Sequence, residues 1–185
     1  MPQDIVTPIL RNSDLGHGYH LVEFSAPDMA AEMQPAQFFM IGIPGGEVLL
    51  RRPFSVCGLG GTFEDRPHDA AQVLYKVVGK GTALLASLRP DAELRVLGPL
   101  GRGFTAPGSA EARPVVVAGG IGSAPFPVLL AALRGKSPRP LMFYGGRSGD
   151  DPVSYTHLRA HETKEDISYA VFCLKRGGGG GGGGG

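Results

Sequence analysis

The sequence contains no tryptophan and only two cysteines, Cys57 and Cys173, among its 185 residues. Two cysteines make neither a disulfide framework nor a four-ligand metal site. The sequence also lacks an excess of either charge, since it has 18 Lys and Arg and 17 Asp and Glu, for a net charge of +1. We therefore expect neither nucleic acid nor an anionic membrane as a partner.

Long apolar runs are absent as well. No stretch approaches the roughly 20 residues of a membrane span. The polar start Met-Pro-Gln-Asp lacks the basic and then apolar pattern of a secretory signal. We expect a cytoplasmic protein, and the 42% apolar content is enough to build a core in one or two domains.

The most informative stretch is Arg52, Pro53, Phe54 and Ser55. Arginine offers a planar fork for a pyrophosphate, phenylalanine a face for stacking on a ring, and serine a short hydrogen-bonding group. Pro53 fixes one backbone dihedral, and on a strand Arg52 and Phe54 project to one side and Ser55 to the other. These residues suit a flat, phosphate-bearing cofactor, although an ordinary edge strand is an alternative.

The first half of the chain reads as short strands separated by Gly and Pro turns, which favours a small closed barrel over a parallel sheet. We predict strands over residues 5–10, 19–25, 37–43, 54–59, 71–78 and 93–97. A single helix over residues 82–88 interrupts them.

That helix follows a second motif, Tyr75-Lys76-Val77-Val78-Gly79-Lys80-Gly81-Thr82. A strand runs into Gly-x-Gly, and Thr82 is expected to cap the helix. Because the first backbone N–H groups of a helix lack partners, such a start can bind an anion, and glycine lets a phosphate approach. A tight turn without any ligand is the alternative.

A third motif begins with the β-branched run at residues 114–118, as expected of a strand buried on both faces. Gly119-Gly120-Ile121-Gly122-Ser123-Ala124-Pro125 leads into an apolar helix over residues 126–133, and a second strand follows at 141–144. This βαβ unit places ligands beyond the carboxyl ends of its strands. Pro125 replaces the third Gly of G-x-G-x-x-G, which argues against an ordinary Rossmann dehydrogenase; a glycine turn used only for packing is the alternative.

The chain changes character after Asp151. The run Ser154 to Thr163 resembles a translated library adapter, and nine glycines end the sequence. We expect native sequence to stop near Asp151 and residues 152–185 to be an artefactual, disordered tail, since polyglycine cannot bury apolar area. A metal pair at His157 and His161 beside Glu162 is the competing interpretation.

Taken in order, the motifs resemble those of the ferredoxin-NADP reductase superfamily. They are most similar to the electron-transfer subunits of NAD-dependent, class 1B dihydroorotate dehydrogenases, and Gly98-Pro99-Leu100-Gly101-Arg102-Gly103-Phe104 adds to the likeness. The resemblance implies a mainly β plus α/β fold. A six-stranded antiparallel FAD-binding barrel at 1–105 would precede an incomplete parallel α/β nicotinamide-binding domain at 112–151.

The resemblance also implies roles for individual residues. Arg52 would contact an FAD phosphate, Pro53 and Phe54 would pack at the flavin, and Ser55 would lie near its reactive nitrogen. Strand contacts to the cofactor would come from Leu74, Tyr75 and Lys76. Gly81 and Thr82 would cradle the pyrophosphate, and Gly119, Gly120 and Gly122 would approach NAD.

The activity implied is electron transfer in pyrimidine biosynthesis, between NAD and an FMN-containing catalytic subunit in a heterotetramer, through FAD and a 2Fe-2S centre. No catalytic residue is assigned, because the hydride and single-electron steps belong to the cofactor. No metal ligand is assigned, because the cluster cysteines are absent from this sequence. Alternatives are a flavin oxidoreductase subunit of hydrogenase or sulfide dehydrogenase type, or a barrel module without FAD. Arg147, which follows the second strand of the βαβ unit, could bind a 2'-phosphate, so NADP is an alternative to NAD.

Overall fold

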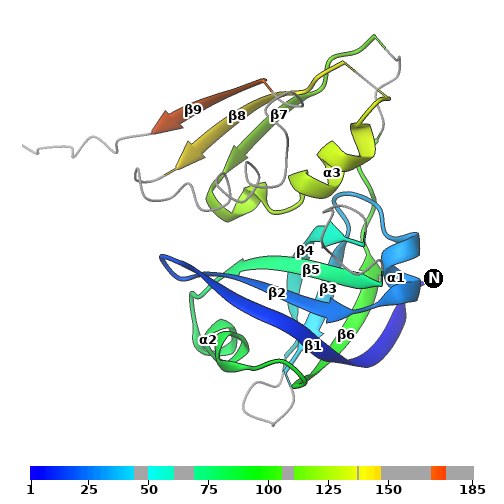
Figure 1. Ribbon diagram of the computed structural model, residues 1–185, viewed down its shortest axis with the longest axis vertical. Helices are drawn as coiled ribbons and strands as arrows, with labels where there is room; N and C mark the ends of the chain where they lie inside the picture. The colour runs from blue at the N-terminus through cyan, green and yellow to red at the C-terminus, as the bar shows by residue number, and fades with distance from the viewer. Residues whose placement is uncertain (44–49, 61–68, 106–110, 137, 147–167, 174–185) are drawn as a thin grey trace, which may run out of the picture.

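Six antiparallel strands form a closed barrel in the computed structural model, which describes residues 1–43, 50–60, 69–105, 111–136, 138–146 and 168–173. The strands run in the order β1-β2-β5-β4-β3-β6, and β1 pairs with β6 to close the ring (Figure 1). The barrel predicted from the sequence is thereby confirmed. The strands are β1 (Gln3–Gly16), β2 (Tyr19–Ser25), β3 (Phe38–Gly42), β4 (Arg52–Leu59), β5 (Ala70–Lys76) and β6 (Glu93–Leu100).

The barrel interior follows from alternation along the strands. Val22 and Phe24 of β2 point inward and are fully buried, and Phe24 meets Phe39 of β3 edge to face at 5.3 Å between ring centroids. Two helices of the barrel lobe add side chains to this core. Helix α1 (Pro27–Glu32) adds Met29, and α2 (Lys80–Ser87) adds Leu85.

A smaller α/β lobe follows the barrel. Strand β7 (Val115–Gly119) leads through a 3-10 helix, η1 (Gly120–Ser123), into α3 (Phe126–Leu133), and the chain returns in β8 (Leu141–Gly146). The two strands are parallel, with Val116 opposite Met142. The predicted strand-turn-helix-strand unit is therefore present, and α3 lies between its sheet and the barrel (Figure 1).

One strand was not expected. Residues 152–185 were predicted to be disordered throughout, yet β9 (Ser168–Cys173) pairs in parallel with β8 as the third strand of the sheet. Its Tyr169, Val171 and Phe172 are strong strand formers, and it covers the hydrogen-bonding edge that β8 would otherwise expose. His157 and His161, the candidate metal pair, lie outside the described residues, as does Arg147.

The two lobes share apolar contacts. Val128 of α3 belongs to the barrel core cluster, while Ala124 packs with Leu21, Cys57 and Leu74 on the outside of the barrel wall. Within the described ranges, no helix is both long enough and apolar enough to cross a membrane.

Candidate functional site

The three sequence motifs meet around one open cavity of about 570 Å³ between the barrel and the second lobe. Strand β4, the end of β5 with the start of α2, and the η1 turn each provide one wall. The lining residues are Arg52, Pro53, Phe54, Ser55, Leu74, Tyr75, Lys76, Val78, Gly79, Lys80, Gly81, Thr82, Ile121, Gly122 and Ala124.

Arg52 lies against the first turn of α2. Its Nη1 donates a hydrogen bond to the Leu50 carbonyl at 2.5 Å. Gly81 is buried beneath the guanidinium, and a Cβ atom at Gly81 would overlap Arg52 Nε and Cζ. A methyl group at this position would push the guanidinium away from the helix start, where a cation and helix N–H groups face the same space.

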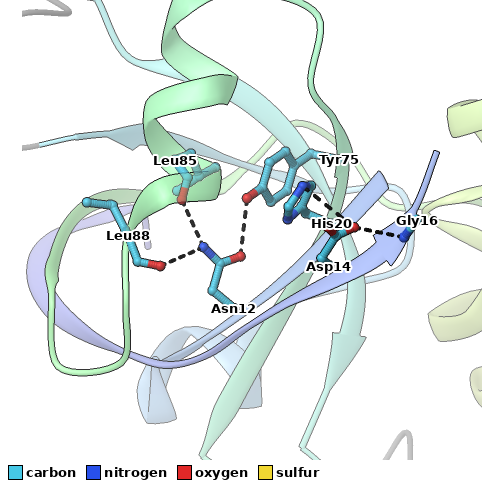
Figure 2. A network of polar contacts seen from close by, with 7 residues as sticks. All are labelled: Asn12, Asp14, Gly16, His20, Tyr75, Leu85 and Leu88. Atoms are coloured by element: carbon cyan, nitrogen blue, oxygen red, sulfur yellow. Dashed lines mark hydrogen bonds and ion pairs between the residues drawn. The ribbon is translucent and has the colours of Figure 1, made fainter. Parts of the chain in front are cut away.

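Tyr75 borders the cavity from the end of β5, with its ring buried in the barrel core. The Phe54 ring meets it edge to face at 5.9 Å, and His20 stacks on it at 5.4 Å with an interplanar angle of 20°. Its hydroxyl donates to Asn12 Oδ1 at 3.2 Å (Figure 2). Burial raises the pKa of Tyr75 to about 12, against the opposing effect of the Asn12 hydrogen bond. The ring is therefore neutral and held in the barrel core.

Thr82 does not occupy the cap position that the sequence suggested. Helix α2 begins at Lys80 with Gly79 as its N-cap, so Thr82 is the third helical residue. Its hydroxyl accepts hydrogen bonds from the N–H groups of Val78 at 2.9 Å and Gly79 at 3.1 Å, and donates to the Gly79 carbonyl at 3.0 Å. Thr82 holds the turn from inside the first helical turn, because its side chain reaches back over the glycine.

The glycines of the third motif are not all at the cavity. Gly122 lines it, whereas Gly119 ends β7 and Gly120 begins η1 outside the lining. Gly120 has φ of +50°, a left-handed conformation that favours glycine, and its carbonyl accepts a hydrogen bond from Ser123 Oγ at 2.9 Å. These two glycines shape the turn that presents Gly122.

Five lining residues lie in these motifs but were assigned no cofactor contact from the sequence: Val78, Gly79, Lys80, Ile121 and Ala124. Val78 carried a usable signal, since a large apolar residue between a strand and a Gly-x-Gly turn does not fit a core position, and it is 81% exposed. Ile121 and Ala124 had no comparable signal, because their place depends on how the second lobe docks. Among the described residues, no group of three or more His, Cys, Asp or Glu side chains could hold a metal ion.

Sequence comparison gives one consistent group of relatives. No protein-family model matches the chain. The dihydroorotate dehydrogenase B (NAD(+)) electron transfer subunit of Desulforamulus reducens is 39% identical over 133 residues, covering 69% of this chain and 47% of the relative. The subunit of the same name from Enterococcus faecalis is 33% identical over 120 residues, covering 64% and 44%. The chain thus spans about half the length of the curated relatives it matches.

Solved structures agree on the fold. A ferredoxin reductase of carbazole 1,9a-dioxygenase superposes with a TM-score of 0.75 at 19% identity, covering 94% of this chain and 51% of that one. A ferredoxin NADP+ reductase from Neisseria gonorrhoeae with bound FAD and NADP gives a TM-score of 0.71 at 18% identity, covering 91% and 67%. The chain is therefore a sequence relative of the dihydroorotate dehydrogenase B electron transfer subunits and has the ferredoxin-NADP reductase fold.

Proposed function

We propose that the cavity binds FAD and that the protein is a flavin-dependent oxidoreductase subunit. Electrons would pass between NAD and the catalytic subunit of dihydroorotate dehydrogenase, in pyrimidine biosynthesis. The proposal is supported by the names of the relatives and by the fold. The whole activity is part of the proposal, because the aligned region covers only 47% of the Desulforamulus reducens relative.

The residues around the cavity fit a flavin dinucleotide. A volume of about 570 Å³ lies within the range of organic-ligand sites. The observation that carries the proposal is the Arg52 guanidinium lying over Gly81 at the start of α2, in a cavity that Phe54 of the same strand also lines. A cation, helix N–H groups and aromatic faces are what a pyrophosphate joined to a flat ring requires.

When bound, FAD supplies the hydride and single-electron chemistry. The chain's own residues bind and orient. Arg52 and the first turn of α2 would hold the pyrophosphate. Phe54 would pack on the flavin ring, Tyr75 would support Phe54 from the barrel core, and Ser55 would place its hydroxyl near the reactive nitrogen of the flavin. Leu74, Ile121 and Ala124 would keep water from one side. No residue is assigned a nucleophilic or acid-base role.

NAD would approach from the η1 side of the cavity. Gly122 lines that wall without a side chain, and no atom lies within 4 Å of where its Cβ would stand. Gly119 and Gly120 would act indirectly, by turning the chain from β7 into η1. The domain limits at 105 and 112–151 and the cytoplasmic location remain predictions.

The partner would be the FMN-containing catalytic subunit, in a heterotetramer, as the family resemblance implies. A 2Fe-2S centre is not part of the proposal for this chain. Such a cluster is most often held by four cysteine thiolates, whereas the sequence has two cysteines, and Cys57 is buried at 2% exposure.

The test is FAD titration of the isolated protein, followed by flavin fluorescence. Arg52→Ala should weaken FAD binding about tenfold or more, because a hydrogen bond to a charged group contributes about 1.5–3 kcal/mol. Arg89→Ala removes an exposed cation outside the cavity lining and should leave the affinity unchanged. Failure of the unaltered protein to bind FAD would contradict the proposal and favour a barrel module without flavin.

A further inference from the structure

Asn12 lies on β1, outside the cavity lining, yet one amide group joins two of the cavity walls (Figure 2). Its Oδ1 accepts the hydrogen bond from the Tyr75 hydroxyl at 3.2 Å. Its Nδ2 donates to the carbonyls of Leu85 at 2.8 Å and Leu88 at 3.0 Å, at the end of α2. The three partners are 63, 73 and 76 residues away in the sequence.

The bond to Tyr75 reaches a buried ring at the cavity. Tyr75 is only 1% exposed, with His20 stacked on its ring and Phe54 meeting its edge. The ring is part of the barrel core cluster, which also contains Leu85 of α2. The hydrogen bond adds a polar link from Asn12 on β1 to this buried ring.

The bonds to Leu85 and Leu88 fix the phosphate wall. Helix α2 has eight residues and is therefore about 12 Å long, so its two ends move together. Its first turn carries Lys80, Gly81 and Thr82 at the cavity. At the other end of the helix, the Leu85 carbonyl accepts the Asn12 amide and also the Leu88 N–H, the latter at 3.2 Å. The hydrogen bonds from Asn12 to the Leu85 and Leu88 carbonyls therefore also fix the position of the first turn of α2.

We infer that Asn12 is a positioning residue for the flavin nucleotide, setting the separation between the Tyr75 ring and the start of α2. The inference rests on the proposed function, since it concerns binding in the same cavity. An amide suits this role because it has both an acceptor oxygen and two N–H donors. Aspartate could only accept, and leucine could do neither.

The experiment measures FAD affinity for the unaltered protein, Asn12→Ala, Asn12→Asp and Tyr75→Phe. Loss of all three hydrogen bonds in Asn12→Ala should weaken binding about tenfold, and Tyr75→Phe about threefold. Asn12→Asp keeps an acceptor for Tyr75 but places a negative charge against the negative end of α2, so its affinity should also fall. In the Tyr75→Phe background, Asn12→Ala should have a smaller effect than alone, because one of its partners is already gone.

Controls separate positioning from folding. Ser13→Ala changes the neighbouring residue, which alternation places on the other face of β1, and should bind FAD like the unaltered protein. Each affinity is measured at a temperature where circular dichroism shows the variant folded. A purely structural role would lower the melting temperature and leave the affinity of the folded protein unchanged.

The outcomes are distinct. If the unaltered protein does not bind FAD, the proposed function fails. If it binds and all Asn12 variants bind equally well, the positioning role is wrong. Should Asn12→Ala and Asn12→Asp fail to fold, Tyr75→Phe decides alone, and unchanged affinity in that variant overturns the inference.

Discussion

Gly81 is the residue on which the arrangement of the cavity depends most directly. In Gly81→Ala the added methyl would overlap the Arg52 guanidinium and displace it from the start of α2. We expect FAD affinity to fall about tenfold by titration, close to the effect of Arg52→Ala. Since alanine favours a helix over glycine by about 1 kcal/mol, a weaker complex could not be ascribed to loss of α2.

Gly79→Ala is the matched comparison for this prediction. Gly79 belongs to the same turn, but no atom lies within 4 Å of where its methyl group would stand, and its φ of −177° is open to any residue. The substitution should cost clearly less affinity than Gly81→Ala. Equal losses would show that the space around Arg52 is not what makes Gly81 necessary.

The buried thiol of Cys57 should make the free energy of unfolding fall as the pH becomes alkaline. Its thiol is buried with Leu21, Leu74 and Ala124, and burial raises its pKa to about 12. The unfolded thiol ionises near pH 8.5, so between about 8.5 and 12 the unfolded chain binds fewer protons and stability falls as pH rises. The unfolding free energy from urea titrations should decline less steeply in Cys57→Ala. Tyr75 adds a similar decline to both proteins, and identical slopes would contradict the assignment to Cys57.

At this scale the sequence predicted which residues border the cavity better than how they are held. Arg52, Phe54 and Tyr75 belong to short motifs that can be interpreted from their residue types and their order along the chain. Asn12 belongs to no motif, and its link to Tyr75 spans 63 residues, so it requires the pairing of β1, β2 and β5 to be known. Hydrogen bonds between distant strands have no local signal.

Helix α2 depends on the Thr82 hydroxyl at its first turn. Thr82→Val keeps the shape of the side chain but removes its hydrogen bonds to Val78 and Gly79. We expect a loss of about 1 kcal/mol in the free energy of unfolding, measured with urea, and near-complete recovery in Thr82→Ser. If the valine variant is as stable as the unaltered protein, water satisfies those N–H groups equally well.

Among the elements, strands were easier to predict than their ends. Strand β2 spans the predicted residues 19–25, whereas β6 continues past residue 97 to Leu100, through Gly98 and Pro99, which resemble breakers in the sequence. Helix α1 was missed because it has only six residues and Met29 is its one buried side chain. So short a helix shows no periodicity, and tertiary burial of Met29 stabilises it.

The whole molecule divides unequally between its lobes. All six barrel strands lie within residues 3–100, so a chain ending at residue 105 should still fold into the barrel. It would lose the Ile121, Gly122 and Ala124 wall and expose Leu21, Cys57 and Leu74. Circular dichroism should show retained β structure, a lower melting temperature and weaker FAD binding. An unfolded product would show that Val128 and α3 are needed to complete the core.

The pairing of β1 with β6, which closes the barrel, also affects how the protein folds while it is being synthesised. Pro8 pairs with Glu93 and Gln3 with Gly98, so the first strand made is joined by the last strand of the barrel. Pairing at this sequence separation is slow, and an N-terminal strand edge stays open while the chain is being made. The ribosome must deliver almost a hundred residues before the ring can close, which makes the nascent barrel a candidate client for chaperones.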